Sequence, residues 1–268
     1  MNLKKIAAAL SMAGATVFSG GALADPSITN VDGTFTPFGG FDWASASGAW
    51  TSGFSGVVGS TFALNYVGWA VSVTDLLGQE IEQFSNLDAT ANGVKKNANA
   101  YEYTVVATFN EKIIGCVSAS QCTFQVTGGT FDIYYDVAAN AVANTAAWAN
   151  FGDGTKILSG VFFGGTTTTF TTTAGGQANL NGLVTYTNNA FINPNLVSTN
   201  VTSTLQLGSA VTNFASPTSL DGNAIGAGQI VFQADANQTF SARVPEPASL
   251  ALVGLALGGL GFVARRRK

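Results

Sequence analysis

The side chains most able to catalyse a reaction in this sequence are carboxylates, and Asp132 and Asp136 form the most visible pair. A glycoside hydrolase needs only two such groups, with carboxyls about 5–9.5 Å apart. Both residues lie in Phe131–Val137, where apolar and polar residues alternate as in a half-buried strand. Four strand residues separate their backbones by about 13 Å, which is too far for glycosidic cleavage. A catalytic pair formed by carboxylates from two different strands is the alternative that stays open. Such a pair would make the protein a secreted carbohydrate-active enzyme.

Other catalytic and metal chemistry finds little support in the sequence. The chain contains no histidine, which removes Ser-His-Asp and Cys-His catalysis and histidine-ligated metals. No P-loop or dinucleotide fingerprint occurs in a strand-to-helix context. Asp153, with Asp132 or Asp136, is a weak calcium candidate, because EF-hand spacing is absent and Asp is common in turns without metal. We therefore expect no enzyme, no cofactor and no metal.

Tyr134 is the best candidate for an exposed aromatic side chain that contacts a ligand. It falls on the same strand face as Asp132 and Asp136. The opposite, core-facing set is Phe131, Ile133, Tyr135 and Val137. Aromatic rings suit sugars because they combine flat apolar faces with polar edges. Tyr134, Asp132 and Asp136 are therefore the predicted ligand contacts, and most other Trp and Tyr residues are expected to pack in the core.

The elements that position these residues are predicted to be strands. Short apolar runs bounded by Gly, Asn, Thr and Ser fill residues 25–244. The expected strands are Gly56–Leu64, Gly68–Val73, Tyr101–Phe109, Phe131–Val137, Ile157–Phe163, Thr166–Thr173, Gly182–Tyr186, Val201–Leu207 and Gln229–Ala234. Tight turns are expected at Gly128-Gly129 and Gly164-Gly165. The pattern favours an all-β fold, with a β-sandwich of jelly-roll type.

Two segments fit this pattern less well. Residues 75–84 place Leu77, Ile81 and Phe84 at helical spacing, although Gly78 weakens a helix there. The alanine-rich stretch 138–149 is interpreted as a loop, because its asparagines and the following Gly-Asp-Gly are typical of turns.

The composition and net charge of the chain argue against nucleic acid as a binding partner. The chain is 46% hydrophobic and only 10% charged, with 32 glycines. Residues 25–244 carry fourteen acidic and five basic side chains, a net charge near −9. Because phosphate binding needs clustered Lys and Arg, nucleic acid is not an expected partner.

The N-terminus has the features of a cleaved signal peptide, residues 1–24. A positive start with Lys4 and Lys5 precedes an apolar stretch that is too short to be a permanent anchor. A small-residue site with Ala22 and Ala24 follows, so we expect cleavage after Ala24. The Sec translocon and signal peptidase are the implied partners. Export puts Cys116 and Cys122, the only cysteines, in an oxidising compartment, where we expect a disulfide at a hairpin tip.

The C-terminus carries the sharper signal. The residues Val244, Pro245, Glu246 and Pro247 precede seventeen uncharged residues, 248–264. The chain then ends in four basic residues, Arg265, Arg266, Arg267 and Lys268. A helix over 248–264 would be about 25 Å long, at the lower edge of a membrane span. We expect a single transmembrane helix whose basic tail stays in the cytoplasm. An ordinary anchor that is never cut is the alternative.

This C-terminal order resembles the PEP-CTERM sorting signal of Gram-negative bacteria, which the membrane enzyme exosortase recognises. The resemblance covers 245–268 and implies three parts: a signal peptide (1–24), a secreted β-rich domain (25–244) and a sorting signal (245–268). It implies that the protein crosses the inner membrane, is anchored there transiently and then reaches the cell surface or extracellular matrix.

A weaker similarity links the body to flocculation-associated PEP-CTERM proteins. It rests on Gly129–Asp136 and Gly152–Gly160. It implies a surface or matrix protein that promotes cell aggregation through association with exopolysaccharide. The alternatives are the two-carboxylate enzyme and an uncleaved, membrane-anchored structural protein.

Overall fold

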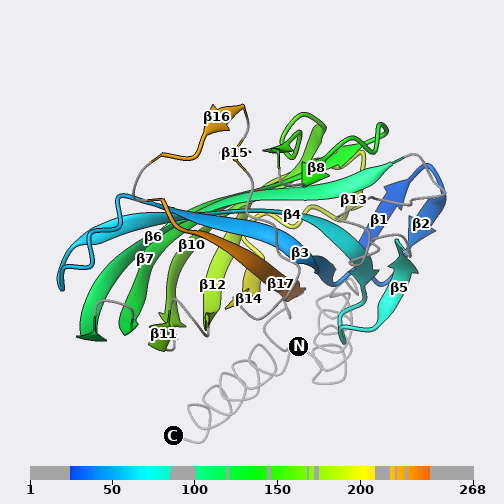
Figure 1. Cartoon of the computed structure of the whole chain (residues 1–268). Coiled ribbons are helices and arrows are strands. Elements are labelled where there is room, and N and C mark those ends of the chain that lie inside the picture. The colour runs from blue at the N-terminus through cyan, green and yellow to red at the C-terminus, as the bar shows by residue number, and fades with distance from the viewer. Residues whose placement is uncertain are drawn as a thin grey trace, which may run out of the picture. The chain divides into compact units, whose positions relative to one another are not determined.

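The structure is a computed structural model of the chain. It describes residues 25–84, 101–118, 121–143, 146–167, 169–171, 175–208, 218–220, 222–226 and 229–241. The described residues form strands and no helix (Figure 1). They belong to one compact unit, Asp25–Ala242, called the body below. The all-β prediction is confirmed. The expected signal peptide and the sorting signal lie outside the described residues.

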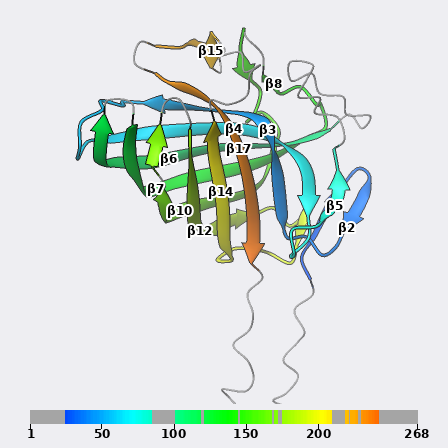
Figure 2. The ribbon, with the colours of Figure 1, turned by 60° about the horizontal axis from the view of Figure 1, so that its bottom comes forward.

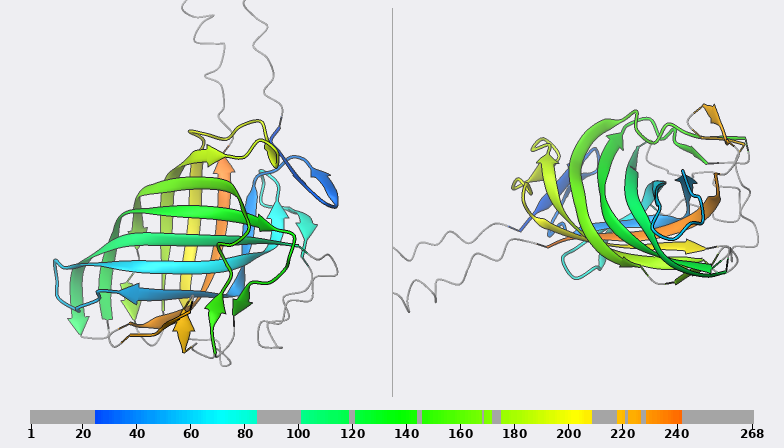
Figure 3. Two further views of the ribbon diagram at one scale, coloured as in Figure 1. Left: turned by 90° about the horizontal axis from the view of Figure 1, so that it is seen from above. Right: turned by 90° about the vertical axis from the view of Figure 1, so that its left-hand side faces the viewer.

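Eight long strands form the main sheet. They are β3 (Gly40–Ser52), β4 (Thr61–Thr74), β6 (Glu102–Ser118), β7 (Gln121–Asp136), β10 (Thr155–Thr167), β12 (Gly176–Thr187), β14 (Asn200–Gly208) and β17 (Val231–Ser241). Each pairs antiparallel with the next along the chain. The last of them, β17, pairs with β3, so the sheet closes on itself (Figures 2 and 3).

This arrangement corrects the expected jelly-roll sandwich. A jelly roll distributes strands over two sheets by Greek-key connections. Here the long strands follow one another in chain order around a single barrel-like sheet. The alternation of apolar and polar residues predicts which face of a strand is buried, but it does not predict which strands pair.

The remaining strands are short and either form two small sheets or pair with a strand of the main sheet. Three form a small sheet: β1 (Ser27–Asn30), β2 (Gly33–Phe35) and β13 (Ile192–Asn193). Four form another: β8 (Val142–Ala143), β9 (Trp148–Ala149), β15 (Ser219–Leu220) and β16 (Asn223–Ala224). In addition, β5 (Glu80–Gln83) pairs with β4, and β11 (Thr169–Thr171) pairs with β7. Residues 75–84 therefore form a turn and a strand and no helix. Between residues 138 and 149, the described residues include two very short strands, β8 and β9.

The two glycine pairs lie within strands, which corrects the prediction of tight turns. Gly128 and Gly129 belong to β7, where the register with β6 shifts next to Gly128. A side chain at Gly129 would place its Cβ 2.5 Å from the carbonyl oxygen of Thr108. Gly164 lies in β10 at a similar register shift against β12. These glycines therefore permit bulges and close backbone approach in strongly curved strands.

Side chains fill the interior of the closed sheet. Buried rings meet there across several strands, with the ring centres of Phe41 and Tyr103 5.4 Å apart and those of Phe131 and Phe162 5.1 Å apart. One interior cavity, bordered by Trp43, Tyr66 and Gln238 among others, has a volume of about 10 Å³. That is room for about one water molecule, so this space is part of a packed core.

A second apolar cluster lies outside the closed sheet. Its buried members are Ala44, Val67, Trp69, Trp148, Phe151 and Leu220. Trp69 stacks on Phe151 at 5.7 Å, and Trp148 and Leu220 come from the four-stranded small sheet. This small sheet therefore covers the outer face of β3 and β4.

The body begins and ends beside one short segment. The amide of Phe38 donates to the carbonyl of Pro26 at 2.6 Å, and the amide of Phe240 donates to the carbonyl of Gly39 at 2.7 Å. The two ends of the body are thus neighbours.

Candidate functional site

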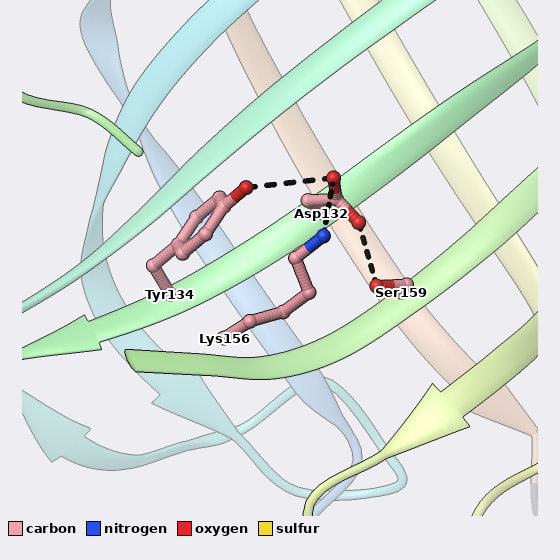
Figure 4. A network of polar contacts seen from close by, with 4 residues as sticks. All are labelled: Asp132, Tyr134, Lys156 and Ser159. Atoms are coloured by element: carbon pink, nitrogen blue, oxygen red, sulfur yellow. Dashed lines mark hydrogen bonds and ion pairs between the residues drawn. The ribbon is translucent and has the colours of Figure 1, made fainter. Parts of the chain in front are cut away.

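A cluster of polar side chains lies on the outer face of β7 and β10 (Figure 4). The register places Asp132 opposite Ser159 and Tyr134 opposite Lys156. Ser159 Oγ donates to Asp132 Oδ1 at 2.6 Å, and Lys156 Nζ lies 2.9 Å from Asp132 Oδ2. The Tyr134 hydroxyl donates to the same Oδ2 at 3.4 Å. Three side chains therefore converge on the single carboxylate of Asp132.

Charge is balanced within this cluster. The Lys156 ammonium also lies 5.6 Å from the centre of the Tyr134 ring, a cation–π contact. Its hydrogen bond to Asp132 raises the pKa of Lys156. Partial burial, followed by the Asp132 charge, raises the pKa of Tyr134. With side-chain exposures of 42% for Lys156 and 35% for Asp132, the pair fixes geometry more than it stabilises the fold.

The structure keeps some predicted site residues together and separates others. Tyr134 and Asp132 share the outer face, where both are half-buried, so Tyr134 is less exposed than predicted. Phe131, Ile133 and Tyr135 are buried as expected. Val137 is 63% exposed, because the strand ends at Asp136. The third predicted ligand contact, Asp136, and the calcium candidate, Asp153, form their hydrogen bonds away from this cluster.

The side chains of Asp136 and Asp153 accept hydrogen bonds from the segment that follows β7. Asp136 Oδ1 accepts from the amide of Ala138 at 2.8 Å, and Asp153 Oδ2 accepts from Asn140 Nδ2 at 3.2 Å. Within the part of the chain that the structure describes, no three Asp, Glu, Cys or His side chains are placed to hold a metal. The Asp153 calcium candidate thus gains no support.

Sequence reasoning missed Lys156 and Ser159. Both are polar positions of β10: Lys156 directly precedes the apolar run that begins at Ile157, and Ser159 interrupts that run. Their place beside Asp132 follows only from the pairing of β10 with β7.

The cysteines form the expected cross-link. Cys116 and Cys122 are opposite each other on β6 and β7 and are joined by a disulfide. The prediction of a disulfide near the tip of a hairpin is confirmed.

Two carboxylates from different segments do meet, at Asp32 and Glu82. The Tyr101 hydroxyl contacts Glu82 Oε1 and lies 2.9 Å from Asp32 Oδ2, and Asn30 Nδ2 donates to both Glu82 oxygens at 2.8 and 3.0 Å. Burial raises the pKa of Glu82. Because Tyr101 stands between the two carboxyls, we interpret the group as a clamp that ties β1 and β5 to the end of the closed sheet.

An uncharged surface, here called the amide face, covers the outside of β12, β14 and β17. These strands lie side by side in Figure 2. The face consists of eight Asn, Gln and Thr residues: Gln177, Asn179, Asn181, Thr202, Thr204, Gln206, Asn237 and Thr239. Six of them are exposed and two are half-buried. The alternating Gln-x-Asn-x-Asn of β12 was the sequence signal for it.

The border of the amide face is acidic. Asp235 pairs with Gln206, and Asp42 of β3 pairs with Asn237. Burial, with the nearby Asp235 charge as the next cause, raises the pKa of Asp42 to about 6. At neutral pH this edge therefore carries negative charge beside a neutral face.

Comparison with known families identifies the C-terminus. Residues 243–268 match the family model of the PEP-CTERM protein-sorting motif. The chain carries a PEP-CTERM sorting signal. This confirms the resemblance that the Pro-Glu-Pro sequence and basic end indicated. No curated protein and no solved structure matches the chain significantly.

The PEP-CTERM motif indicates where the protein is sorted. It implies processing by exosortase and export to the cell envelope or surface of a Gram-negative bacterium. The described residues include no helix with the length and hydropathy of a membrane span. The predicted span, 248–264, and the cleavage site at Ala24 lie outside them.

Proposed function

We propose that this PEP-CTERM protein is a non-enzymatic surface or matrix protein that promotes cell aggregation by associating with exopolysaccharide. The sorting motif supports the location. The observation that carries the proposal is the packed interior of the closed sheet, where buried rings meet and the cavity beside Tyr66 and Gln238 has a volume of about 10 Å³. A closed sheet packed in this way acts through its outer surface, which suits a polymer better than a small enclosed substrate.

The mechanism is weak, repeated contact between a rigid scaffold and a long polymer. Many protein copies on one polymer, and several polymers on one cell, raise the avidity without any single strong site. The Asp132–Lys156 pair keeps the surface around Tyr134 close to neutral, and the half-buried Tyr134 ring is the aromatic group that would contact a sugar there. Acidic polymers would need divalent cations as bridges, because the body is itself strongly acidic.

The alternatives are weaker. The Asp32–Glu82 pair has its space occupied by Tyr101, which argues against two-carboxylate hydrolysis there. The second alternative is a membrane-anchored structural protein whose C-terminal tail is never cleaved. It differs from the proposal only in whether residues 265–268 are retained, which the intact mass of the protein decides.

The test uses the native host. A strain lacking the gene receives the wild type, Glu246→Ala or the control Asp153→Ala, and aggregation, cell fractions and intact mass are measured. We expect the wild type and the control to restore aggregation with a mature chain that starts at Asp25 and lacks the basic tail. Glu246→Ala should stay in the membrane fraction with its tail and fail to restore aggregation.

Two results would contradict the proposal. Loss of the gene could leave aggregation unchanged, which removes the role. Alternatively, the wild-type chain could retain residues 265–268 in the membrane, which makes the tail a plain anchor.

A further inference from the structure

We propose that the amide face of β12, β14 and β17 is a binding surface for a neutral, polyhydroxylated polymer. This inference rests on the proposed function, and it names both the surface and the chemical class of polysaccharide.

The first support is the regular spacing of the face. Gln177 pairs with Gln206, Asn179 with Thr204 and Asn181 with Thr202, and on the next strand Thr204 pairs with Asn237 and Thr202 with Thr239. Directly paired residues of an antiparallel sheet share a face. The polar groups therefore form rows about 4.8 Å apart between strands and about 6.7 Å apart along them. Such an array presents repeated contacts to a repeating polymer.

The second support is unused hydrogen-bonding capacity. An amide side chain carries two donors and one acceptor oxygen. Asn179 Oδ1 accepts from Gln177 Nε2 at 3.3 Å and from Thr204 Oγ1 at 3.2 Å, which orients that side chain. Neither the Asn181 nor the Asn237 side chain has a hydrogen bond to another described residue. Their donors and acceptors face solvent and are available to sugar hydroxyls, which both donate and accept.

The third support is charge. None of the eight side chains is ionisable, although residues 25–244 have a net charge near −9. Asp42 and Asp235 border the face and would repel an anionic polymer. A neutral polymer meets no such repulsion and requires no counter-charge. The acidic border therefore disfavours an anionic polysaccharide, and a neutral one is the class that fits this surface.

The test is affinity electrophoresis of the mature protein from its host, in native gels containing dextran, hydroxyethylcellulose or alginate, with and without EDTA. We expect at least one neutral polymer to retard the wild type, with no effect of EDTA. Asn181→Asp/Asn237→Asp should weaken that retardation about tenfold, because two direct hydrogen-bonding sites become charged. Asn181→Lys/Asn237→Lys should weaken it similarly, which excludes a simple effect of negative charge.

The matched control is Asn110→Asp/Gln125→Glu. It adds two negative charges on exposed positions of β6 and β7, away from the amide face, and should bind like the wild type. Near-ultraviolet circular dichroism checks that every variant is folded. A folded Asp or Lys double variant with wild-type retardation overturns the inference.

Other outcomes also overturn it. If neither neutral polymer retards the wild type, the chemical class is wrong. If Tyr134→Ala abolishes retardation while the amide-face variants keep it, the proposed function stands and the site is the Asp132 cluster. If the wild type is a dimer that the amide-face variants convert to monomers without any polymer binding, the face holds a second copy of the chain.

Discussion

Glu111 of β6 is an ionisable group inside the closed sheet. Phe109 and Ile113, two positions to either side on the same strand, are core residues, and Glu111 itself is only 4% exposed. No hydrogen bond or ion pair joins its carboxyl to another described residue. Burial alone raises the pKa of Glu111 to about 7. The core therefore tolerates the protonated acid and is destabilised by the carboxylate.

The pH dependence of stability follows from that shift. The carboxyl has a pKa near 4.5 when unfolded and about 7 when folded, so the folded state binds the extra proton between these values. The contribution of Glu111 to stability is therefore most favourable below pH 4.5, falls as the pH rises to 7 and stays lowered above it, by about 3 kcal/mol. We expect Glu111→Gln to raise the free energy of unfolding by about that amount at pH 8 and to change it little at pH 4.

Urea unfolding followed by tryptophan fluorescence at both pH values measures this effect. Asp153→Asn is the control, since Asp153 is an exposed turn residue. A Glu111→Gln protein that is less stable than the wild type at pH 8 would refute the assignment.

At the level of elements, the four-stranded small sheet depends on one glycine of β3. A Cβ at Gly48 would lie 1.7 Å from Trp148 Cζ3, which no small adjustment relieves. We expect Gly48→Ala to displace Trp148 and open the outer cluster, at a cost of about 1–3 kcal/mol, while the closed sheet persists. Limited proteolysis should then cleave within residues 137–155.

Gly115→Ala on β6 is the matched control, because no atom lies within 4 Å of its Cβ position. It should leave the protease pattern unchanged. Equal protection of residues 137–155 in Gly48→Ala and wild type would show that Trp148 does not hold the small sheet.

The elements also show what the sequence can predict. Alternation at Phe131–Val137 predicted which face of β7 is buried, although Val137 itself lies past the end of the strand and is exposed. Two cysteines in an exported chain without histidine predicted the disulfide. The pairing of strands, by contrast, could not be predicted from these local patterns. Gly128-Gly129 has the composition of a turn, but close approach to Thr108 makes it a bulge within a strand. Lys156 and Ser159 join Asp132 only because β10 lies beside β7, a long-range fact that local patterns do not contain.

At the scale of the whole molecule, the neighbouring ends of the body permit a change of connectivity. Pro26 and Phe240 are both hydrogen-bonded to the segment Phe38-Gly39. We expect a circular permutant to fold if a flexible linker of about six residues joins Ser241 to Asp25 and the new ends lie between Gly56 and Val57. Its thermal midpoint should fall within a few degrees of the wild-type value.

A chain without residues 231–241 is the comparison. It loses β17 and with it the pairings to β14 and β3, so it should show no cooperative unfolding transition. A cooperative transition in that truncated chain, or none in the permutant, would contradict the importance of closure.

The pairing of β17 with β3 also sets an order of events during secretion. A chain that crosses the inner membrane from its N-terminus delivers β3 early and β17 last among the long strands. Until β17 arrives, β3 and β14 each present an unpaired edge, and such edges are templates for pairing with other chains. Slow or interrupted translocation therefore leaves half-delivered copies adhesive toward one another, and rapid completion of the last strand protects the cell from aggregates in its own envelope.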